Sequence, residues 1–348
     1  MSNRQPTTQE WRRLYEAAIN VKKLAPWEWM YEDEVFGVRN PETGETGFVS
    51  VMGMGGEHFS IALYPDPVAL YAFWDLQEDA QFAEEEIEPE RVLEIQQIQA
   101  SLEDRDYLSK EDRDLIKKLG LKFRGANSWP MFRSYSPGLF PWYLTGVEAR
   151  FLTYALEQLL DVAPRVREDE EILMPTDEDN DLLVRVSREE NGKLIWEDEI
   201  VKIPQPPPPP LIKPQIDLKE IEKLKATPLK NHSIELDVRM LPMPVKETER
   251  PFFPYLMLIV DSKMGLIMGV EMLQPLPTIA AMRANVPNKL MEFFAKLDAI
   301  PNQVVMRAEW LVGMLKPLTD ELNIKLKLVS SLPNTDEAFE ELLQMSVR

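Results

Sequence analysis

The chain has 348 residues, no cysteine and a formal net charge of −20 at pH 7, and its length predicts two domains. The absence of cysteine excludes disulfides, thiolate catalysis and metal sites with cysteine ligands. Residues 1–228 hold 26 Lys+Arg and 44 Asp+Glu, a net charge of −18, so this part is expected to repel nucleic acid.

The first part of the chain predicts a helix followed by antiparallel strands. The helix begins after Thr7, which has the spacing of a capping box to Glu10, and it ends before Pro26. Three short apolar segments are predicted to be strands, at 34–40, 46–53 and 58–65. A second helix is predicted over 66–86, with proline in its first turn.

Gly53, Gly55 and Gly56 are the only cluster of glycines in the chain. A phosphate-binding loop leads from a strand into the first turn of a helix, whose backbone amides hold the anion. These glycines lie between two predicted strands, and His58 stands where a third motif glycine is required. We therefore predict a turn with positive φ angles and no nucleotide-binding loop.

The middle of the first part is less regular. Residues 92–102 fit a strand or a helix, and the pattern leaves both open. A short helix is predicted at 109–120, with Ser109 and Asp112 as its cap. The aromatic-rich stretch that follows is predicted to be a loop broken by proline and glycine up to Thr145, and an amphipathic helix after it. A hairpin is predicted to turn at Asn191-Gly192.

Two segments of biased composition follow. Residues 168–181 contain eight acids and no base, and we interpret them as a solvated loop, because the calcium-loop pattern fails at Leu182 and Arg188. Residues 204–214 are rich in proline and are predicted to be a stiff linker. The predicted domains are therefore 1–203 and 215–348, both of the α+β class, and the first contains antiparallel hairpins.

The second domain predicts the element order βββαβαβα, which resembles that of a ribonuclease H-like domain. The strands are predicted at 233–241, 254–262, 265–273, 302–307 and 324–332, and the helices at 278–298, 308–322 and 335–345. Nucleases of this fold hold two Mg²⁺ ions on carboxylates. The candidate metal ligands are Asp237, Asp261, Glu309 and Asp336. Asp237 alternates with charged neighbours and is expected to face solvent, and Arg307 would repel a metal ion.

The aromatic-rich stretch supplies the leading candidate for a binding site. The candidate ligand-binding residues are Trp129, Phe132, Arg133, Tyr135, Trp142 and Tyr143, with a core-lining role as the alternative. The chain has only two histidines, which excludes a metal site with several histidine ligands. The sequence shows no pairing of a catalytic nucleophile with a general base. We expect a binding or accessory protein that uses no cofactor and binds a small molecule or a protein partner. The alternative is a metal-dependent nuclease or nucleic-acid-processing factor using the second domain.

Four motifs resemble those of a bacterial cytoplasmic protein family made of two associated domains of unknown function. They are W-x2-LYEAA, L-x-PW-x-WM, FGV-x-NPE-TGE and VMG-x2-GE, all in residues 11–57. The resemblance implies a bacterial origin and a pair of associated domains, and it implies no activity. The start MSNRQPTTQEW has no apolar leader, and no apolar run is long enough to span a membrane. A cytoplasmic protein is expected.

Overall fold

The computed structural model describes residues 4–82, 89–174, 176, 180–208 and 211–346. The chain forms two compact units. The first consists of Met1–Ser136 with Pro141–Pro207, and the second consists of Pro137–Phe140 with Pro208–Arg348. Each unit combines a β-sheet with helices, which confirms the predicted α+β class. Residues 175 and 177–179 of the acidic segment 168–181 and two linker residues (209–210) lie outside the described residues. Within that segment, Glu170–Leu173 forms a 3₁₀ turn and Asp181 begins a strand.

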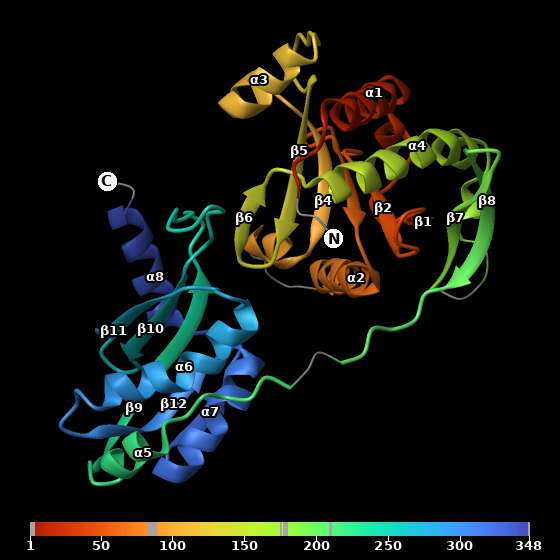
Figure 1. The fold of residues 1–348 in the computed structure, drawn as a ribbon. Coiled ribbons are helices and arrows are strands. Elements are labelled where there is room, and N and C mark those ends of the chain that lie inside the picture. The colour runs from red at the N-terminus through yellow and green to blue at the C-terminus, as the bar shows by residue number, and fades with distance from the viewer. Residues whose placement is uncertain (1–3, 83–88, 175, 177–179, 209–210, 347–348) are drawn as a thin grey trace. The chain divides into compact units, whose positions relative to one another are not determined.

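The first unit is built on an eight-stranded sheet of order β6-β5-β4-β3-β2-β1-β7-β8 (Figure 1). Its strands are β1 (Phe36–Arg39), β2 (Thr46–Met52), β3 (Ser60–Tyr64), β4 (Gln97–Glu103), β5 (Trp129–Ser136), β6 (Leu139–Trp142), β7 (Asp181–Glu190) and β8 (Lys193–Lys202). β1 runs antiparallel to β2 and parallel to β7. The predicted turns are confirmed, because Gly53 and Gly56 have φ angles of 129° and 81°, and the Asn191-Gly192 hairpin joins β7 to β8.

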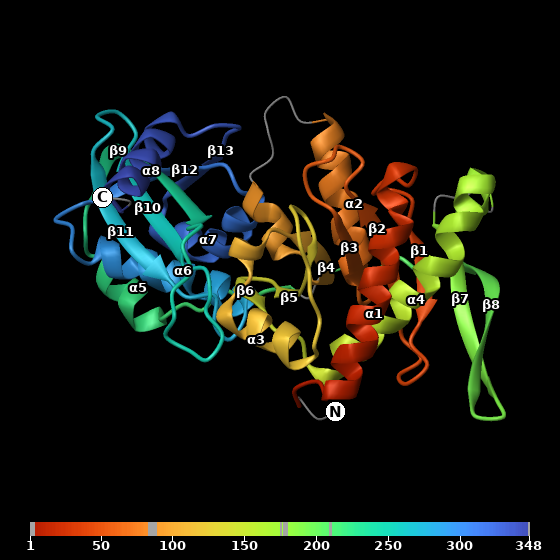
Figure 2. The same cartoon turned by 90° about the horizontal axis from the view of Figure 1, so that it is seen from above.

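Helices cover both faces of this sheet (Figure 2). They are α1 (Thr8–Leu24), α2 (Pro67–Phe82), α3 (Lys110–Lys118) and α4 (Gly146–Glu168). α1 and α4 bury their apolar faces with Phe36, Val49 and Ile61 on one side of the sheet. α2 packs with Phe48 and Tyr64 on the other side, so the first unit has two cores. The predicted capping box at the start of α1 is confirmed.

The predicted aromatic loop before residue 145 is wrong. Trp129–Ser136 forms β5, which pairs with β4 along its length, and Leu139–Trp142 forms β6. Proline and glycine suggested a loop, but they stand where a hairpin tolerates them. Pro141 lies in β6, at the edge of the sheet, and Gly138 has a φ angle of 76° between the two strands. The ambiguous stretch at 92–102 becomes β4 after a 3₁₀ turn at Pro89–Glu94.

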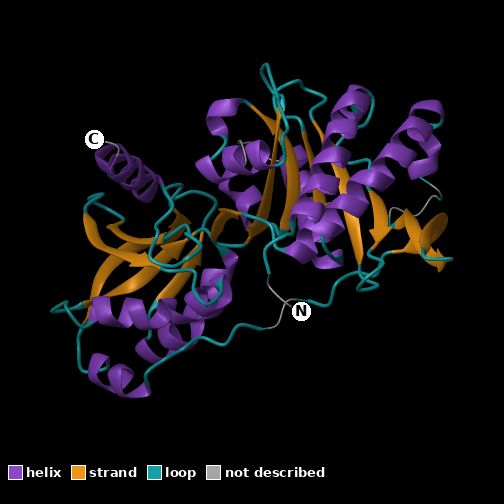
Figure 3. Cartoon of the chain, turned by 45° about the horizontal axis from the view of Figure 1, so that its top comes forward, coloured by secondary structure: helices purple, strands orange, loops and turns teal. Residues whose placement is uncertain are grey.

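The second unit has a five-stranded sheet of order β11-β10-β9-β12-β13 (Figures 1 and 2). Figure 3 shows its strands in orange and its helices in purple. The strands are β9 (Leu229–Met240), β10 (Tyr255–Asp261), β11 (Ile267–Leu273), β12 (Ile300–Met306) and β13 (Lys325–Leu328). The helices are α5 (Leu218–Leu224), α6 (Ile279–Phe294), α7 (Glu309–Leu322) and α8 (Pro333–Ser346). From β9 onward the element order is the predicted one, whereas the sequence analysis missed α5.

Helices lie on both faces of the second sheet as well. α8 packs on Leu258 and Val260 of β10, and Phe293 of α6 packs over Gly269 on the opposite face. β9 runs antiparallel to β10 and parallel to β12. None of the helices within the described residues is long and apolar enough to cross a membrane.

Candidate functional site

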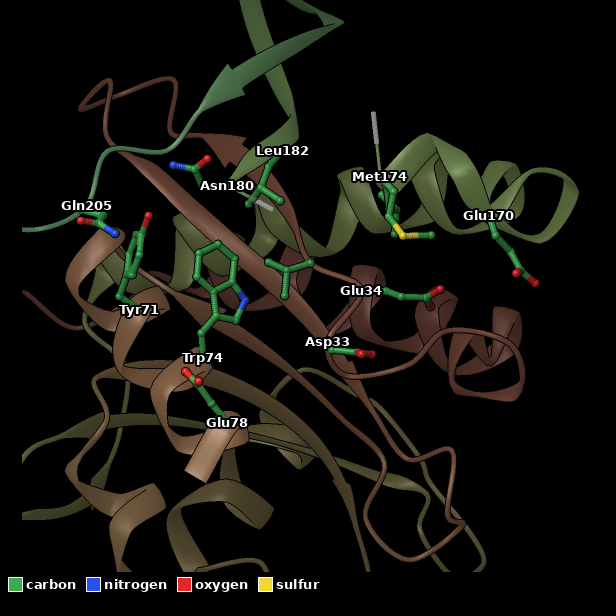
Figure 4. Close-up of a pocket in the computed structure, with 12 residues that line it drawn as sticks. Asp33, Glu34, Tyr71, Trp74, Glu78, Glu170, Met174, Asn180, Leu182 and Gln205 are labelled. Atoms are coloured by element: carbon green, nitrogen blue, oxygen red, sulfur yellow. The ribbon is translucent and has the colours of Figure 1, made fainter. Parts of the chain in front are cut away.

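A cavity of about 790 Å³ lies in the first unit, beside α2 and the beginning of β7. Figure 4 shows Tyr71, Trp74 and Glu78 projecting from α2 on one side and Glu34 facing them from the segment before β1. The residues that line the cavity are Asp33, Glu34, Val35, Tyr71, Trp74, Glu78, Glu170, Leu173, Met174, Asn180, Leu182 and Gln205. Its volume falls within the range of small-molecule sites.

Aromatic side chains form one wall of this cavity. Tyr71 and Trp74 are three residues apart on α2 and therefore project from the same helix face. Their rings meet edge to face, with centroids 5.0 Å apart and an interplanar angle of 74°. The Tyr71 hydroxyl donates a hydrogen bond of 3.2 Å to the carbonyl of Ile203, which fixes that ring. The wall is thus held in place by packing and by one hydrogen bond.

Carboxylates provide the charge of the cavity. Asp33, Glu34, Glu78 and Glu170 line it, and no lysine, arginine or histidine is found among the described residues that do. Within the described part of the chain, none of these four carboxylates forms an ion pair. Glu34 accepts a hydrogen bond of 2.7 Å from the backbone N–H of Tyr31. Burial raises the pKa of Glu34, the Tyr31 N–H opposes this rise, and the negative charges of Asp33 and Glu170 add to it.

This combination is suited to an organic cation. Negatively charged groups that remain uncompensated repel one another, and a cation in the cavity would relieve that repulsion. The faces of Trp and Tyr rings also attract a cation through their quadrupoles. The sequence analysis missed this site. Its signals were the acidic run at 32–34 directly before a strand and the spacing of Tyr71, Trp74 and Glu78 on one helix face.

The structure places the six predicted ligand-binding residues against different neighbours, three of them in or beside the core. Phe132 is 3% exposed and packs edge to face on Tyr15, with ring centroids 4.9 Å apart. The Tyr135 hydroxyl donates to Gln99 at 2.9 Å. Trp129, at the start of β5, packs against Phe123. These three residues contact different neighbours because they are spread along β5, with Trp129 and Tyr135 at the two ends of its pairing with β4 and Phe132 between them.

The other three predicted ligand-binding residues form a structural cluster. Arg133 donates to both carboxylate oxygens of Asp112, at 3.0 and 2.6 Å, and its guanidinium lies over the Tyr143 ring. The Tyr143 hydroxyl donates to Ser109, the cap of α3, at 3.0 Å. Trp142 packs against Tyr143. The polar groups of Arg133 and Tyr143 are therefore occupied within the protein.

In the second unit, Asp237 and Asp336 meet through two arginines. Arg307 donates to Asp237 at 2.6 Å and to Asp336 at 3.1 Å. Arg239 donates to Asp237 at 2.7 Å and also pairs with Asp336. The expectation that Asp237 faces solvent is wrong, because Asp237 is 3% exposed. Its face of the sheet is covered by α8, and Thr335 of that helix bonds the neighbouring Glu235.

The other two candidate metal ligands lie elsewhere. Asp261 ends β10 and accepts hydrogen bonds from the backbone N–H groups of Lys263 and Met264, and it also pairs with His232. Glu309 is exposed at the first turn of α7. Among the residues that the structure describes, no group of three or more His, Asp or Glu side chains could hold a metal ion.

Comparison with known families gives two matches. One model, described as a domain of unknown function (DUF7309), matches residues 11–185, about half of the chain. A second, also a domain of unknown function (DUF6930), matches residues 220–343. No curated protein matches the chain. The predicted pair of associated domains of unknown function is therefore confirmed.

Proposed function

We propose that this chain, which belongs to the family of the domain of unknown function DUF7309, is a non-enzymatic binding protein for a small organic cation. The observation that carries the proposal is the coincidence of four unpaired carboxylates with an aromatic pair in one cavity of about 790 Å³. The ligand places an ammonium group near Glu34 and Glu78, and its apolar part rests on Tyr71 and Trp74.

The proposed binding site is the cavity beside α2 and not the aromatic segment 129–143. In that segment Phe132 supports the core, and Arg133 is held by a buried carboxylate. The cavity beside α2 has side chains that lack such partners. It also lies in the part of the chain that carries most of the negative charge, which raises the local concentration of cations. A cytoplasmic location is part of this proposal, because the cysteine-free chain has no need of an oxidising compartment.

A ribonuclease H-like fold for the second unit is also part of the proposal. The strand order β11-β10-β9-β12-β13 and the parallel pairing of β9 with β12 support it. The pairing of Asp237 and Asp336 with Arg239 and Arg307 argues against the alternative of a two-metal nuclease, because the guanidinium groups already satisfy these carboxylates. We propose a binding role for this unit as well. Fold similarity does not determine activity.

Calorimetric titration of the full chain with choline and spermidine at low ionic strength tests the cation site. The neutral isostere 3,3-dimethyl-1-butanol has the shape of choline without its charge. We expect choline or spermidine to bind with a measurable Kd and the neutral compound not to bind. The double substitution Glu34→Gln/Glu78→Gln is expected to weaken binding at least about tenfold, which is about 1.4 kcal/mol.

The matched control is Asp75→Asn. Asp75 is exposed on the same helix and does not line the cavity, so the change removes a carboxylate without touching the site. We expect the control to change the Kd less than about twofold, because exposed charges at a distance are screened. Equal binding of the neutral isostere, or equal weakening in the control and the cavity variant, would refute the proposal.

A further inference from the structure

A second cavity of the first unit has the opposite charge. It has a volume of about 600 Å³ and lies between α3, the loop that follows it and the beginning of β5. Five cations line it together with a single carboxylate: Arg105, Arg113, Lys117, Lys122, Arg124 and Asp114. In a chain of net charge −20, this local excess of positive charge is a distinct feature.

The five cations have no ion-pair partner in the part of the chain that the structure describes. By contrast, Arg133, Arg150 and Arg185 of the same unit each pair with a carboxylate. Asp114 is the one carboxylate among the described lining residues, and the cations outnumber it five to one. The excess positive charges repel one another, and an anion in the cavity relieves this repulsion. The nearby carboxylate of Asp112 does not serve, because it is occupied by Arg133 and Ser109.

The local backbone brings these cations together. α3 ends at Lys118, and Gly120, with a φ angle of 74°, reverses the chain behind it. The N–H of Leu121 then bonds the carbonyl of Ile116 at 3.1 Å, a C-terminal capping contact that also fixes the start of the loop. Lys122 and Arg124 thereby return to the cavity that Lys117 lines from the last turn of the helix.

Aromatic rings form the apolar part of the same cavity. Phe123 and Trp129 both line it, with ring centroids 5.7 Å apart and an interplanar angle of 60°. Phe123 is stacked on buried Tyr15, so its ring is held from behind by the core. Flat aromatic ligands such as a nucleobase stack on such rings.

We propose that this cavity binds a free nucleoside di- or triphosphate, with the base against Phe123 and Trp129 and the phosphates among the lysines and arginines. Five cations exceed what a single phosphate requires, and the volume matches that of small-molecule sites. A nucleic acid strand offers the same chemistry in longer form. The net charge of −18 on residues 1–228 repels a long polyanion outside the cavity, which favours the free nucleotide.

Equilibrium titrations of the full chain with ATP, inorganic triphosphate, adenosine and a short single-stranded oligonucleotide test this proposal. We expect ATP to bind more tightly than triphosphate or adenosine, because it uses both the cations and the rings, and more tightly than the oligonucleotide. The double substitution Lys117→Glu/Lys122→Glu reverses two charges of the cavity. It is expected to raise the Kd for ATP at least about tenfold, because the phosphates lose two charge-assisted partners and meet two negative charges instead.

The matched control is Lys110→Glu/Lys118→Glu. Both lysines are exposed at the ends of α3 and do not line the cavity, so the change in net charge is the same. We expect the control to raise the Kd for ATP less than about threefold at moderate salt. Absence of saturable ATP binding, equal weakening in both double variants, or tighter binding of the oligonucleotide than of ATP would each overturn the proposal.

Discussion

The two cavities of the first unit are similar in construction and opposite in charge. Each has a pair of aromatic rings and a group of like-charged side chains that form no ion pair within the described residues. The acidic cavity takes its rings from α2, which packs with the core on one side of the eight-stranded sheet. The basic cavity takes its rings from Phe123 and Trp129, which pack against the core on the other side. One sheet thus supports two cavities of opposite charge.

The opposite charges of the two cavities show that the net charge of a chain does not predict the charge of an individual cavity. The −18 of residues 1–228 suggests only cationic partners, yet seven lysines and arginines fall within residues 105–124. Charged side chains that form ion pairs stabilise the fold, whereas those that line the two cavities form no ion pair among the described residues. Arg133 belongs to the structure, because it pairs with buried Asp112, whereas Arg105 and Glu78 line cavities and pair with nothing in the described chain.

The largest expected effect separates the core aromatics from the cavity aromatics. Phe132 lies three residues after Trp129, but it is buried against Tyr15 and Trp11. Phe132→Ala is expected to lower the free energy of unfolding by about 4 kcal/mol, as in other large-to-small core substitutions. The control Phe132→Leu keeps most of the volume and should cost less than about 1.5 kcal/mol. Urea denaturation measures both, and an unchanged stability of Phe132→Ala would place this ring in a ligand site after all.

The next effect compares a paired arginine with an unpaired one. Arg133→Ala leaves the carboxylate of Asp112, 6% exposed, without its cation, and we expect a loss of about 3 kcal/mol. Arg105→Ala, at the basic cavity, should change stability by less than about 0.5 kcal/mol. Similar losses in the two variants would contradict the distinction between structural and free cations.

The same pair predicts a pH dependence. Burial raises the pKa of Asp112, but the hydrogen bonds and charge of Arg133, with Ser109, outweigh it, so the pKa is lowered overall. A lowered carboxyl pKa stabilises the fold at pH above the unfolded value of about 3.9, and this contribution is lost as the pH falls through the folded value. Denaturation between neutral and acidic pH should show this loss in the parent protein and a smaller one in Arg133→Ala.

Local patterns predicted most of the elements and little of the sites. Capping boxes, turn residues and alternating strands depend on neighbours in the sequence, so α1, α3 and the hairpin at Asn191-Gly192 could be recognised from sequence. Asp237 could not be placed in this way. Its burial depends on α8, which begins almost a hundred residues later, and on Arg307, the residue directly after β12.

The cavities required the tertiary structure for the same reason. Glu34 precedes β1, Trp74 lies on α2 and Leu182 lies on β7, and they meet only because β7 joins the sheet next to β1. The basic cavity is more local, since its lining lies within residues 105–129. Its cations were visible in the sequence, but the closing of the loop behind α3 was not.

The smallest expected effect concerns the electrostatic cost of an ionised carboxylate in the acidic cavity. Burial raises the pKa of Glu34, so its ionised form is disfavoured in the folded protein. A raised carboxyl pKa means that stability declines as the pH rises above the unfolded value of about 4.3 through the folded value. Glu34→Gln removes this cost. Because the side chain is partly open to solvent, we expect a gain of at most about 0.5 kcal/mol at pH 7 and none at pH below 4.

Glu16→Gln, an exposed change on α1, should have no such pH-dependent gain. Choline should then raise the stability of the parent protein more than it raises that of the Glu34→Gln variant. The reason is that the stability added by a ligand increases with its affinity for the folded state. A loss of stability in Glu34→Gln at pH 7 would show that this carboxylate holds the fold together, and the acidic cavity would then lose its resemblance to the basic one.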